Sequence, residues 1–584
     1  MKDNNNKMSS FTRGSQIFMH SLRMAGQGIK TTSLLGGIIA LAWLLFRASG
    51  KIQLTDFYYW FMVGFAHVKL SIGEIFYNRQ EIIITSYDFI LQQNRTMPAL
   101  EFIQRIWQAP IGHRIMDFQG WLLNNSIFEA IAAFSLSLSI SSIFFIIRGK
   151  KNMQKTKIRG GDFVLKEELA RSLYRQKLAS DIKIAGLPLV KNSENMHMVI
   201  TGITGSGKTN LLHELLVQIR KRGDKAIIVD VNGSLLSAYY SENDKILNPY
   251  DQRSKLWLPW ADCKQDYDFD ALAKTLGSES HKHDPYWDNS ARKIIATALK
   301  EYKHDPDIKK LLHILNTASS LEYSNFFADT NVASLTQIGA SGGDKTAMSI
   351  RSNIGEKIYS LSLLQQTNNP FSITDYILNE DDNSWLFMTS MPDQRQALSP
   401  LITSWMDIAL HALMKRPPTN ENSKIWIIID ELPAIGYIPS LKTALAESRK
   451  YGGCIVAGMQ NIHQLKTIYQ HNEALALLDQ FNSRFIFRVG DDDTANINSR
   501  MLGIRESKEN MESLSYGANT IRDGVNINTI ERQTPLVLPT EITLLKSLEC
   551  YVKLAGSWPI TKLSMDYNKR KTIAPWFVPK TPSG

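Results

Sequence analysis

Residues 202–209, Gly-Ile-Thr-Gly-Ser-Gly-Lys-Thr, constrain the fold of this chain more than any other stretch of its sequence. They match the phosphate-loop pattern G-x-x-x-x-G-K-[ST] at every fixed position. An apolar run over residues 196–200 precedes the loop, and apolar residues at helical spacing over 210–219 follow it. The motif requires a strand, a loop and a helix in this order. The setting therefore favours nucleotide binding over the alternative, a glycine-rich turn at the end of a strand.

The residue types in this loop suit a triphosphate and its metal ion. Glycines let consecutive backbone N–H groups face one anion, and the positive N-terminal end of the following helix adds to the attraction. Lys208 can reach the β- and γ-phosphates, and the Thr209 hydroxyl can ligate Mg²⁺. With ATP and Mg²⁺ as the expected ligands, the predicted nucleotide-binding residues are Gly202, Ile203, Thr204, Gly205, Ser206, Gly207, Lys208 and Thr209.

A second motif lies more than two hundred residues further on. The apolar run 425–429 ends in the paired acids Asp430 and Glu431. A strand beside the phosphate-loop strand would deliver Asp430 to the Mg²⁺ shell and Glu431 to the attacking water. Apolar runs ending in Asp-Glu are also common as exposed strand ends, so this assignment depends on the phosphate loop. Another apolar strand ends in Gln460, which we expect either to contact the γ-phosphate or to cap the strand.

Two uncharged apolar segments near the N-terminus predict membrane spans. Residues 31–46 lie between Lys30 and Arg47, and residues 130–147 lie between Glu129 and Arg148. Snorkelling of the flanking cations extends the first, slightly short segment. A cleaved signal peptide is the alternative for this segment, but it would export the nucleotide site from the compartment that holds ATP. Three widely spaced cysteines among 584 residues indicate neither a disulfide framework nor a metal cluster.

The distribution of charge predicts the orientation of these spans. Residues 1–30 contain five Lys or Arg and one acid, and residues 148–160 contain six and no acid. Because cytoplasmic flanks are enriched in Lys and Arg, both clusters are expected in the cytoplasm and the loop between the spans outside it. The two clusters account for the whole formal surplus of +10. The basic composition therefore indicates membrane topology, and DNA binding needs other support. The aromatic run 57–66 is too short to span comfortably, so we expect it to pack on the membrane face or on a partner.

The remainder predicts an α/β fold: a RecA-like P-loop ATPase domain with an all-α insertion domain, preceded by two N-terminal transmembrane helices. Buried-strand patterns occur at 225–230, 385–388 and 485–489, whereas the sequence between residues 262 and 370 is helical and polar. The expected segments are a cytoplasmic basic N-terminus (1–30), transmembrane helix 1 (31–47), a periplasmic segment (48–128), transmembrane helix 2 (129–147), the first part of the nucleotide-binding domain (148–261), the all-α domain (262–375), its second part (376–567) and a short C-terminal tail (568–584).

Several of these motifs together resemble one family. The chain is similar to the type IV secretion coupling proteins, close to the TraD/TrwB-type conjugation ATPases of the FtsK–HerA superfamily. The resemblance rests on the phosphate loop, Asp430-Glu-Leu-Pro433, residues 447–453 (ESRKYGG), residues 458–460 (GMQ) and residues 555–560 (AGSWPI), together with the two predicted spans. It covers most of the chain and is weaker in the loop between the spans and in the all-α segment.

The resemblance implies a multi-pass ATPase of the bacterial inner membrane, forming a ring that is expected to be a hexamer. Such proteins bring a relaxase–single-stranded DNA complex or a protein effector to a type IV secretion channel and drive its transfer. The all-α domain is expected to meet single- or double-stranded DNA. The position of the family's arginine that reaches a neighbouring subunit's γ-phosphate is Arg449, with Arg484 and Arg488 as fallback candidates. A solvated helix residue paired with Glu447 is the alternative for Arg449. Many relatives extend into a long acidic tail, whereas this chain stops soon after Lys580, which leaves its choice of partners open.

Two other functions stay open on the sequence alone. An FtsK-like double-stranded DNA translocase would share the motor core, but it would usually have more membrane spans and a DNA-reading C-terminal module. A membrane receptor that binds ATP as a switch and moves nothing is the second alternative. The sequence leaves open whether the cargo is DNA, protein or both.

Overall fold

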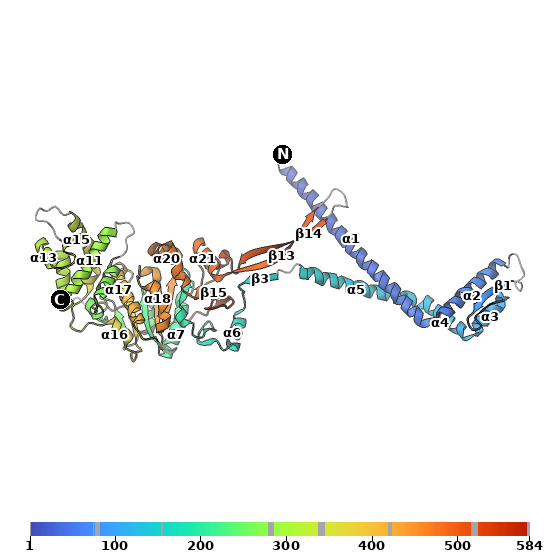
Figure 1. The fold of residues 1–584 in the computed structure, drawn as a ribbon, viewed down its shortest axis with the longest axis horizontal. Helices are drawn as coiled ribbons and strands as arrows, with labels where there is room; N and C mark the ends of the chain where they lie inside the picture. The colour runs from blue at the N-terminus through green and yellow to red at the C-terminus, as the bar shows by residue number, and fades with distance from the viewer. Residues whose placement is uncertain are drawn as a thin grey trace. The chain divides into compact units, whose positions relative to one another are not determined.

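The computed structural model describes residues 2–73, 75, 82–152, 156–277, 285–336, 345–418, 423–515 and 524–580 (Figure 1). The chain forms two compact units. The first contains Met1–Thr156 and Glu509–Ile530, and the second contains Lys157–Lys508 and Glu531–Gly584. Each unit has its own core, so the two are described in turn.

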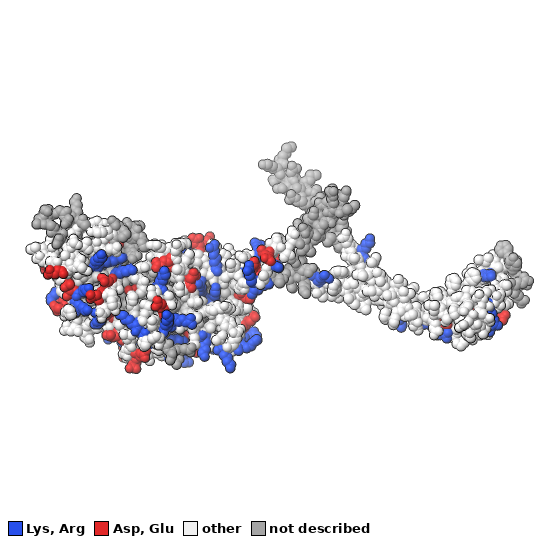
Figure 2. Space-filling model, viewed as in Figure 1, with Lys and Arg blue, Asp and Glu red and all other residues white. Residues whose placement is uncertain are grey.

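Two long apolar helices of the first unit pack against each other. They are α1 (Lys2–Lys51) and α5 (Ser126–Asn152). Arg47 and Glu129 form an ion pair between them, with 2.9 Å from Nε to Oε2. The stretches Gly26–Lys51 and Ser126–Arg148 are long and apolar enough to cross a membrane, and they contain the predicted spans. Charged side chains are scarce along the described part of this helix pair (Figure 2).

The segment between these helices folds into a small domain. It consists of α2 (Leu54–Gly73), the antiparallel strands β1 (Ile83–Asp88) and β2 (Gln93–Pro98), α3 (Ala99–Gln108) and α4 (Pro110–Asn124). The aromatic run 57–66 lies in α2, where Tyr59, Val63 and Ala66 join a buried core with α3. We expected this run to pack on the membrane or on a partner. One face of the run instead packs within the chain, because apolar residues at helical spacing form a stripe on α2 that is buried in the core of the small domain.

The second unit is built around a nine-stranded sheet with the order β16-β15-β12-β6-β11-β10-β7-β9-β8. The strands are β6 (Met198–Thr201), β7 (Lys225–Asp230), β8 (Lys245–Leu247), β9 (Trp385–Thr389), β10 (Ile425–Ile429), β11 (Gly453–Met459), β12 (Ser483–Ile486), β15 (Glu549–Lys553) and β16 (Thr561–Ser564). All neighbours run parallel except the pairs β12–β15 and β15–β16. The central strands are continuous apolar runs because both faces of the sheet are covered.

Alternate residues of these strands enter two different cores. Ile227 and Ile427 belong to the core that includes α17 (Arg395–Met414), whereas Ile228 and Ile428 belong to the core that includes α7 (Lys208–Arg222). Helix α17 is also apolar and long enough to span a membrane. It is instead a core helix of this unit, since most of its side chains are buried.

Residues between 262 and 375 form helices, with no strand among those that the structure describes. They are α10 (Asp266–Leu276), α11 (Pro285–Glu301), α12 (Ile308–Leu312), η3 (His313–Thr317), α13 (Ser320–Phe326), α14 (Ala333–Thr336), α15 (Lys345–Ile358), η4 (Tyr359–Leu363) and α16 (Ile373–Leu378). This helical segment leaves the sheet after β8 and returns to it at β9, so it is an insertion between two neighbouring strands.

The remaining elements surround the sheet. They are α6 (Lys166–Arg175), β4 (Ala179–Ile184), β5 (Leu187–Val190), η2 (Glu194–Met196), α8 (Ser234–Tyr239), α9 (Pro259–Asp262), η5 (Leu432–Ala434), α18 (Leu441–Glu447), η6 (Ser448–Tyr451), α19 (Ile462–Tyr469), α20 (His471–Asp479), α21 (Asp492–Leu502) and α22 (Pro539–Thr543). A separate three-stranded sheet has the order β14-β13-β3, from β3 (Thr156–Gly160), β13 (Ile504–Ser515) and β14 (Gly524–Pro535). Blue and red side chains are interspersed on the visible face of the second unit (Figure 2).

Candidate nucleotide-binding site

The phosphate loop connects β6 to α7 at the carboxyl edge of the sheet. Gly205 and Gly207 have φ values of 75° and 124°, a region that L side chains rarely adopt. A Cβ atom on Gly207 would also lie 2.8 Å from the Phe487 ring. The Ser206 hydroxyl donates to the Ile203 carbonyl at 2.7 Å and closes the loop from inside. The backbone conformation of the loop therefore itself requires Gly205 and Gly207.

Lys208 lies at the start of α7 and is 8% exposed. Its Nζ donates to the Gly202 carbonyl at 2.5 Å, within the loop that it follows. Burial lowers the pKa of Lys208, and the nearby Glu431 and Asp430 oppose this shift. A buried cation whose hydrogen-bond partners are carbonyls of the loop is placed to exchange them for phosphate oxygens.

The paired acids follow β10, between the ends of β7 and β11. The Asn232 Nδ2 atom donates to Asp430 Oδ2 at 3.2 Å, and the Gln460 backbone N–H donates to Glu431 Oε1 at 3.2 Å. Burial raises the pKa of both Asp430 and Glu431. The Thr204 hydroxyl donates to Gln460 Oε1 at 3.1 Å, so the phosphate loop and the end of β11 are also joined.

These side chains surround one cavity of about 550 Å³. Its lining residues are Ile203, Thr204, Gly205, Gly207, Lys208, Thr209, Asn210, Asn232, Asp430, Glu431, Gln460, Ser547, Leu548 and Tyr567. The structure thus brings the phosphate loop together with Asp430, Glu431 and Gln460, as expected for parallel strands whose carboxyl ends meet. The Thr209 hydroxyl and the Asp430 carboxylate are hard oxygen donors in a cavity with room for phosphates and water, which fits Mg²⁺.

Sequence reasoning missed several residues of this site. Asn232 follows β7 and contacts Asp430, although no motif marks it in the sequence. Asp230 is fully buried, accepts the backbone N–H groups of Leu235 and Leu236 at 2.8 Å, and has its pKa raised to about 6 by burial.

The other missed residues come from the C-terminal part of the chain. Ser547, Leu548 and Tyr567 line the cavity. The Leu548 N–H donates to the Ser206 carbonyl at 2.7 Å, and Leu548 has a φ of 68°. No motif marks these positions in the sequence, and their place follows only from the fold.

Arg449 does not reach the cavity of its own chain. Arg449 lies in η6, which precedes the first residue of β11, whereas Gln460 follows the last residue of β11. The seven residues of β11 separate the two positions by about 23 Å. The Arg449 side chain is exposed and has no hydrogen bond or ion pair with any residue that the structure describes. By contrast, Arg484 is buried and donates to the carbonyls of Phe481 and Leu478.

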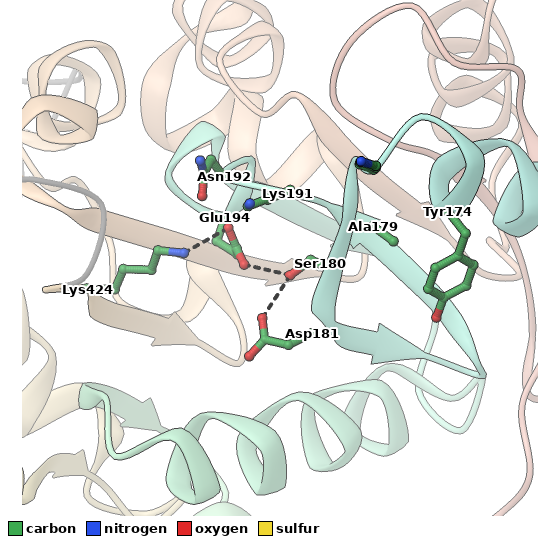
Figure 3. Close-up of a pocket in the computed structure, with 9 residues that line it drawn as sticks. Tyr174, Ala179, Ser180, Asp181, Lys191, Asn192, Glu194 and Lys424 are labelled. Carbon is green, nitrogen blue, oxygen red and sulfur yellow. Dashed lines mark hydrogen bonds and ion pairs between the residues drawn. The ribbon is translucent and has the colours of Figure 1, made fainter.

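A second, polar cavity of about 360 Å³ (Figure 3) lies at the amino edge of the sheet, because its lining residue Lys424 immediately precedes β10. It is lined by Tyr174, Lys177, Ala179, Ser180, Asp181, Lys191, Asn192, Glu194 and Lys424. Glu194 lies between Lys424 and Ser180 and contacts both.

Comparison with known proteins matches these features to one family. Residues 181–566 match the family model of the type IV secretion-system coupling protein DNA-binding domain. The chain is 34% identical over 471 residues to the coupling protein TraD of Escherichia coli strain K12, covering 78% of this chain. It spans 65% of the length of TraD. It is also 21% identical over 183 residues to VirD4 of Agrobacterium fabrum, covering 31% of this chain and 27% of VirD4.

Solved structures agree with the sequence comparison. The plasmid coupling protein TrwB in complex with the ATP analogue ADPNP superposes with a TM-score of 0.64 at 29% identity, covering 73% of this chain and 98% of the TrwB chain. TrwB in complex with ADP and Mg²⁺ gives a TM-score of 0.65 at 28% identity, with the same coverage.

Proposed function

Because the chain belongs to the type IV secretion-system coupling proteins, we propose that it is an ATP-driven coupling protein. In this role it brings a relaxase–single-stranded DNA complex, a protein effector or both to a type IV secretion channel, and hydrolysis of ATP drives the transfer. One observation carries the proposal: Lys208, Asp430 and Glu431 line the same cavity as the phosphate loop. TrwB, which shares the fold, is known with ADPNP and with ADP and Mg²⁺ bound.

Each side chain of the cavity has a different role in ATP hydrolysis. The loop N–H groups and Lys208 hold the β- and γ-phosphates, and Thr209 with Asp430 holds Mg²⁺. When bound, the metal neutralises charge on the phosphate oxygens. Glu431 orients and polarises the attacking water, and its raised pKa makes it a stronger base. Gln460 lies between Glu431 and Thr204, so it is placed to respond to the γ-phosphate.

The position of Arg449 supports a ring of subunits. It lies at the opposite edge of the sheet from its own cavity, and its guanidinium has no partner among the described residues. Because Arg449 cannot reach its own cavity from this position, a catalytic role would place it at the site of a neighbouring copy, where it would stabilise the charge that develops on the γ-phosphate. We infer a homo-oligomer with Arg449 at each interface, and a hexamer is the expected form.

Two membrane helices at residues 31–47 and 129–147 would anchor the protein in the bacterial inner membrane. Their basic flanks at 1–30 and 148–160 place both of these segments in the cytoplasm and residues 48–128 in the periplasm. The ATPase unit then lies in the cytoplasm. The helical insertion over 262–375 is the segment that we assign to contact with DNA.

The test is ATP hydrolysis by the full-length protein in lipid nanodiscs, measured without DNA, with single-stranded DNA and with double-stranded DNA. We expect turnover that single-stranded DNA increases. Stimulation by double-stranded DNA alone would indicate a duplex translocase. ATP binding without hydrolysis under any of these conditions would contradict a motor and indicate an ATP-dependent switch.

A further inference from the structure

The turn that carries Arg449 is fixed along its backbone. Its Tyr451 carbonyl accepts a hydrogen bond from Arg416 at 2.8 Å, and the Gly452 carbonyl accepts one from the Ile425 N–H at 3.0 Å. The buried Ser448 packs against Gly453, where an added Cβ would lie 2.9 Å from the Ser448 side chain. The Arg449 guanidinium and the neighbouring Lys450 ammonium are exposed and extend from this turn without a hydrogen bond or ion pair among the described residues.

The connection before β6 contacts this turn and the two elements that flank it, α18 and β11. The Asn195 Nδ2 atom donates to the Arg449 carbonyl at 3.3 Å. The His197 Nε2 atom contacts the Leu445 carbonyl in α18 at 3.0 Å, and its Nδ1 accepts the Ile455 N–H of β11 at 3.2 Å. This pattern requires a neutral imidazole with the proton on Nε2, and burial lowers the pKa of His197 to about 4.

This connection is itself anchored to the sheet. Glu194 is only 5% exposed, and its carboxylate accepts hydrogen bonds from the Ser180 hydroxyl at 2.9 Å and from Lys424 at 3.0 Å (Figure 3). Ser180 belongs to β4, and Lys424 immediately precedes β10, the strand that ends at Asp430. Asn195 therefore projects from a rigid support and not from a free loop.

The same connection continues directly into the strand of the phosphate loop. His197 precedes β6, and Gly202 follows it, a distance of about 16 Å along the strand. His197 has a φ of 62°, an unusual conformation for a residue with a side chain, and the surrounding contacts hold it there. Strand β6 thus has the nucleotide cavity of its own chain at one end and the Arg449 turn at the other.

We propose that Asn195 and His197 are positioning residues for Arg449, which they fasten to the phosphate-loop strand of the same chain. The inference rests on the proposed role of Arg449 at a neighbouring subunit's site. Through these contacts, the strand that bears one subunit's nucleotide sets where that subunit's arginine stands in the next site. Transition-state stabilisation depends steeply on geometry, and a misplacement of about 1 Å can cost on the order of 100-fold in rate. Loss of one anchor should therefore lower turnover without changing ATP binding.

The experiment compares Asn195→Ala with a matched control, Asn482→Ala, in the full-length protein. Asn482 Nδ2 donates to the Met196 carbonyl at 3.2 Å, so the control removes a hydrogen bond from the same connection that does not lead to Arg449. We expect Asn195→Ala to lower kcat about tenfold with KM for ATP unchanged, and Asn482→Ala to have little effect. The isosteric Asn195→Asp, which cannot donate, should behave like Asn195→Ala. The buried His197 is tested second, as His197→Gln, because larger changes there put folding at risk.

A double-mutant cycle with Arg449→Ala separates positioning from general stability. Hydrolysis is measured in single turnovers with excess protein, so that slow rates remain detectable. If Asn195 acts through Arg449, Asn195→Ala should cause no further loss in the Arg449→Ala background. A repeated tenfold loss in that background, or equal effects of Asn195→Ala and Asn482→Ala, would overturn the inference. If Arg449→Ala alone retains normal hydrolysis, the assignment of Arg449 under the proposed function fails, which is a distinct result.

Discussion

The backbone N–H of Gln460 donates a hydrogen bond to Oε1 of Glu431, with 3.2 Å between the two atoms. The pair joins the carboxyl ends of two neighbouring parallel strands, β10 and β11. It fixes the carboxylate proposed to polarise water relative to the amide proposed to respond to the γ-phosphate. Since Thr204 of the phosphate loop also contacts Gln460, the three motifs form one connected unit.

The first prediction separates ATP binding from hydrolysis. Lys208→Ala should weaken ATP binding roughly 10- to 100-fold, because it removes a charge-assisted hydrogen bond to phosphate. Glu431→Gln should bind ATP normally but lower kcat by about 10²- to 10⁴-fold, because an amide cannot act as a base. Isothermal titration and a phosphate-release assay measure the two effects. Normal turnover by Glu431→Gln would refute its assignment.

The second prediction concerns Asp230, whose pKa is raised to about 6 by burial. The folded state holds the proton over a range in which the unfolded chain has already lost it. The contribution of Asp230 to the free energy of unfolding is therefore present at pH 4 and is lost as the pH rises through 6. The Asn side chain of Asp230→Asn does not titrate. The Tm of this variant minus the Tm of the wild type should therefore increase from pH 4 to pH 7. Differential scanning calorimetry without nucleotide checks this, and a constant difference in Tm would contradict it.

The parts of the fold that follow from local pattern were predictable from the sequence. The phosphate loop between a strand and a helix, and Asp430 at the end of a buried strand, follow from motifs and from the rule that parallel strands end at one edge. The family assignment was correct because the motifs that carry it are specific in combination. The two apolar helices were visible because a membrane span needs a long uncharged run.

Residues whose role depends on tertiary contacts were not predictable. Leu548 and Tyr567 reach the cavity from beyond residue 540 without any motif, and only the fold brings them to the phosphate loop. Asn195 and His197 bond to backbone carbonyls and an N–H, which can be recognised only once the chain is folded. That one face of the aromatic run 57–66 packs within the chain was not foreseen for a related reason, since its partner α3 begins at Ala99.

The third prediction tests the membrane topology. A periplasm-active reporter such as alkaline phosphatase should be active when fused after residue 94 and inactive when fused after residue 160. A cytoplasm-active reporter should give the reverse result, because the Lys- and Arg-rich flanks keep both basic segments inside. Equal behaviour of the two fusion sites would exclude a model with two spans.

The last prediction concerns Arg449 and its action across a subunit boundary. Arg449→Ala should bind ATP but lower kcat roughly 10³-fold or more, because a guanidinium at the γ-phosphate contributes on this scale where it has been measured. Lys450→Ala is the matched control, since it removes an exposed cation from the same turn. Mixing Arg449→Ala with Lys208→Ala subunits should restore part of the hydrolysis, because some interfaces then combine an intact Lys208 with an intact Arg449. The mixed rings are verified by two affinity tags before the ATPase rate is measured over a range of mixing ratios. Rates that equal the sum of the two separate variants at every ratio would show that Arg449 does not act in trans.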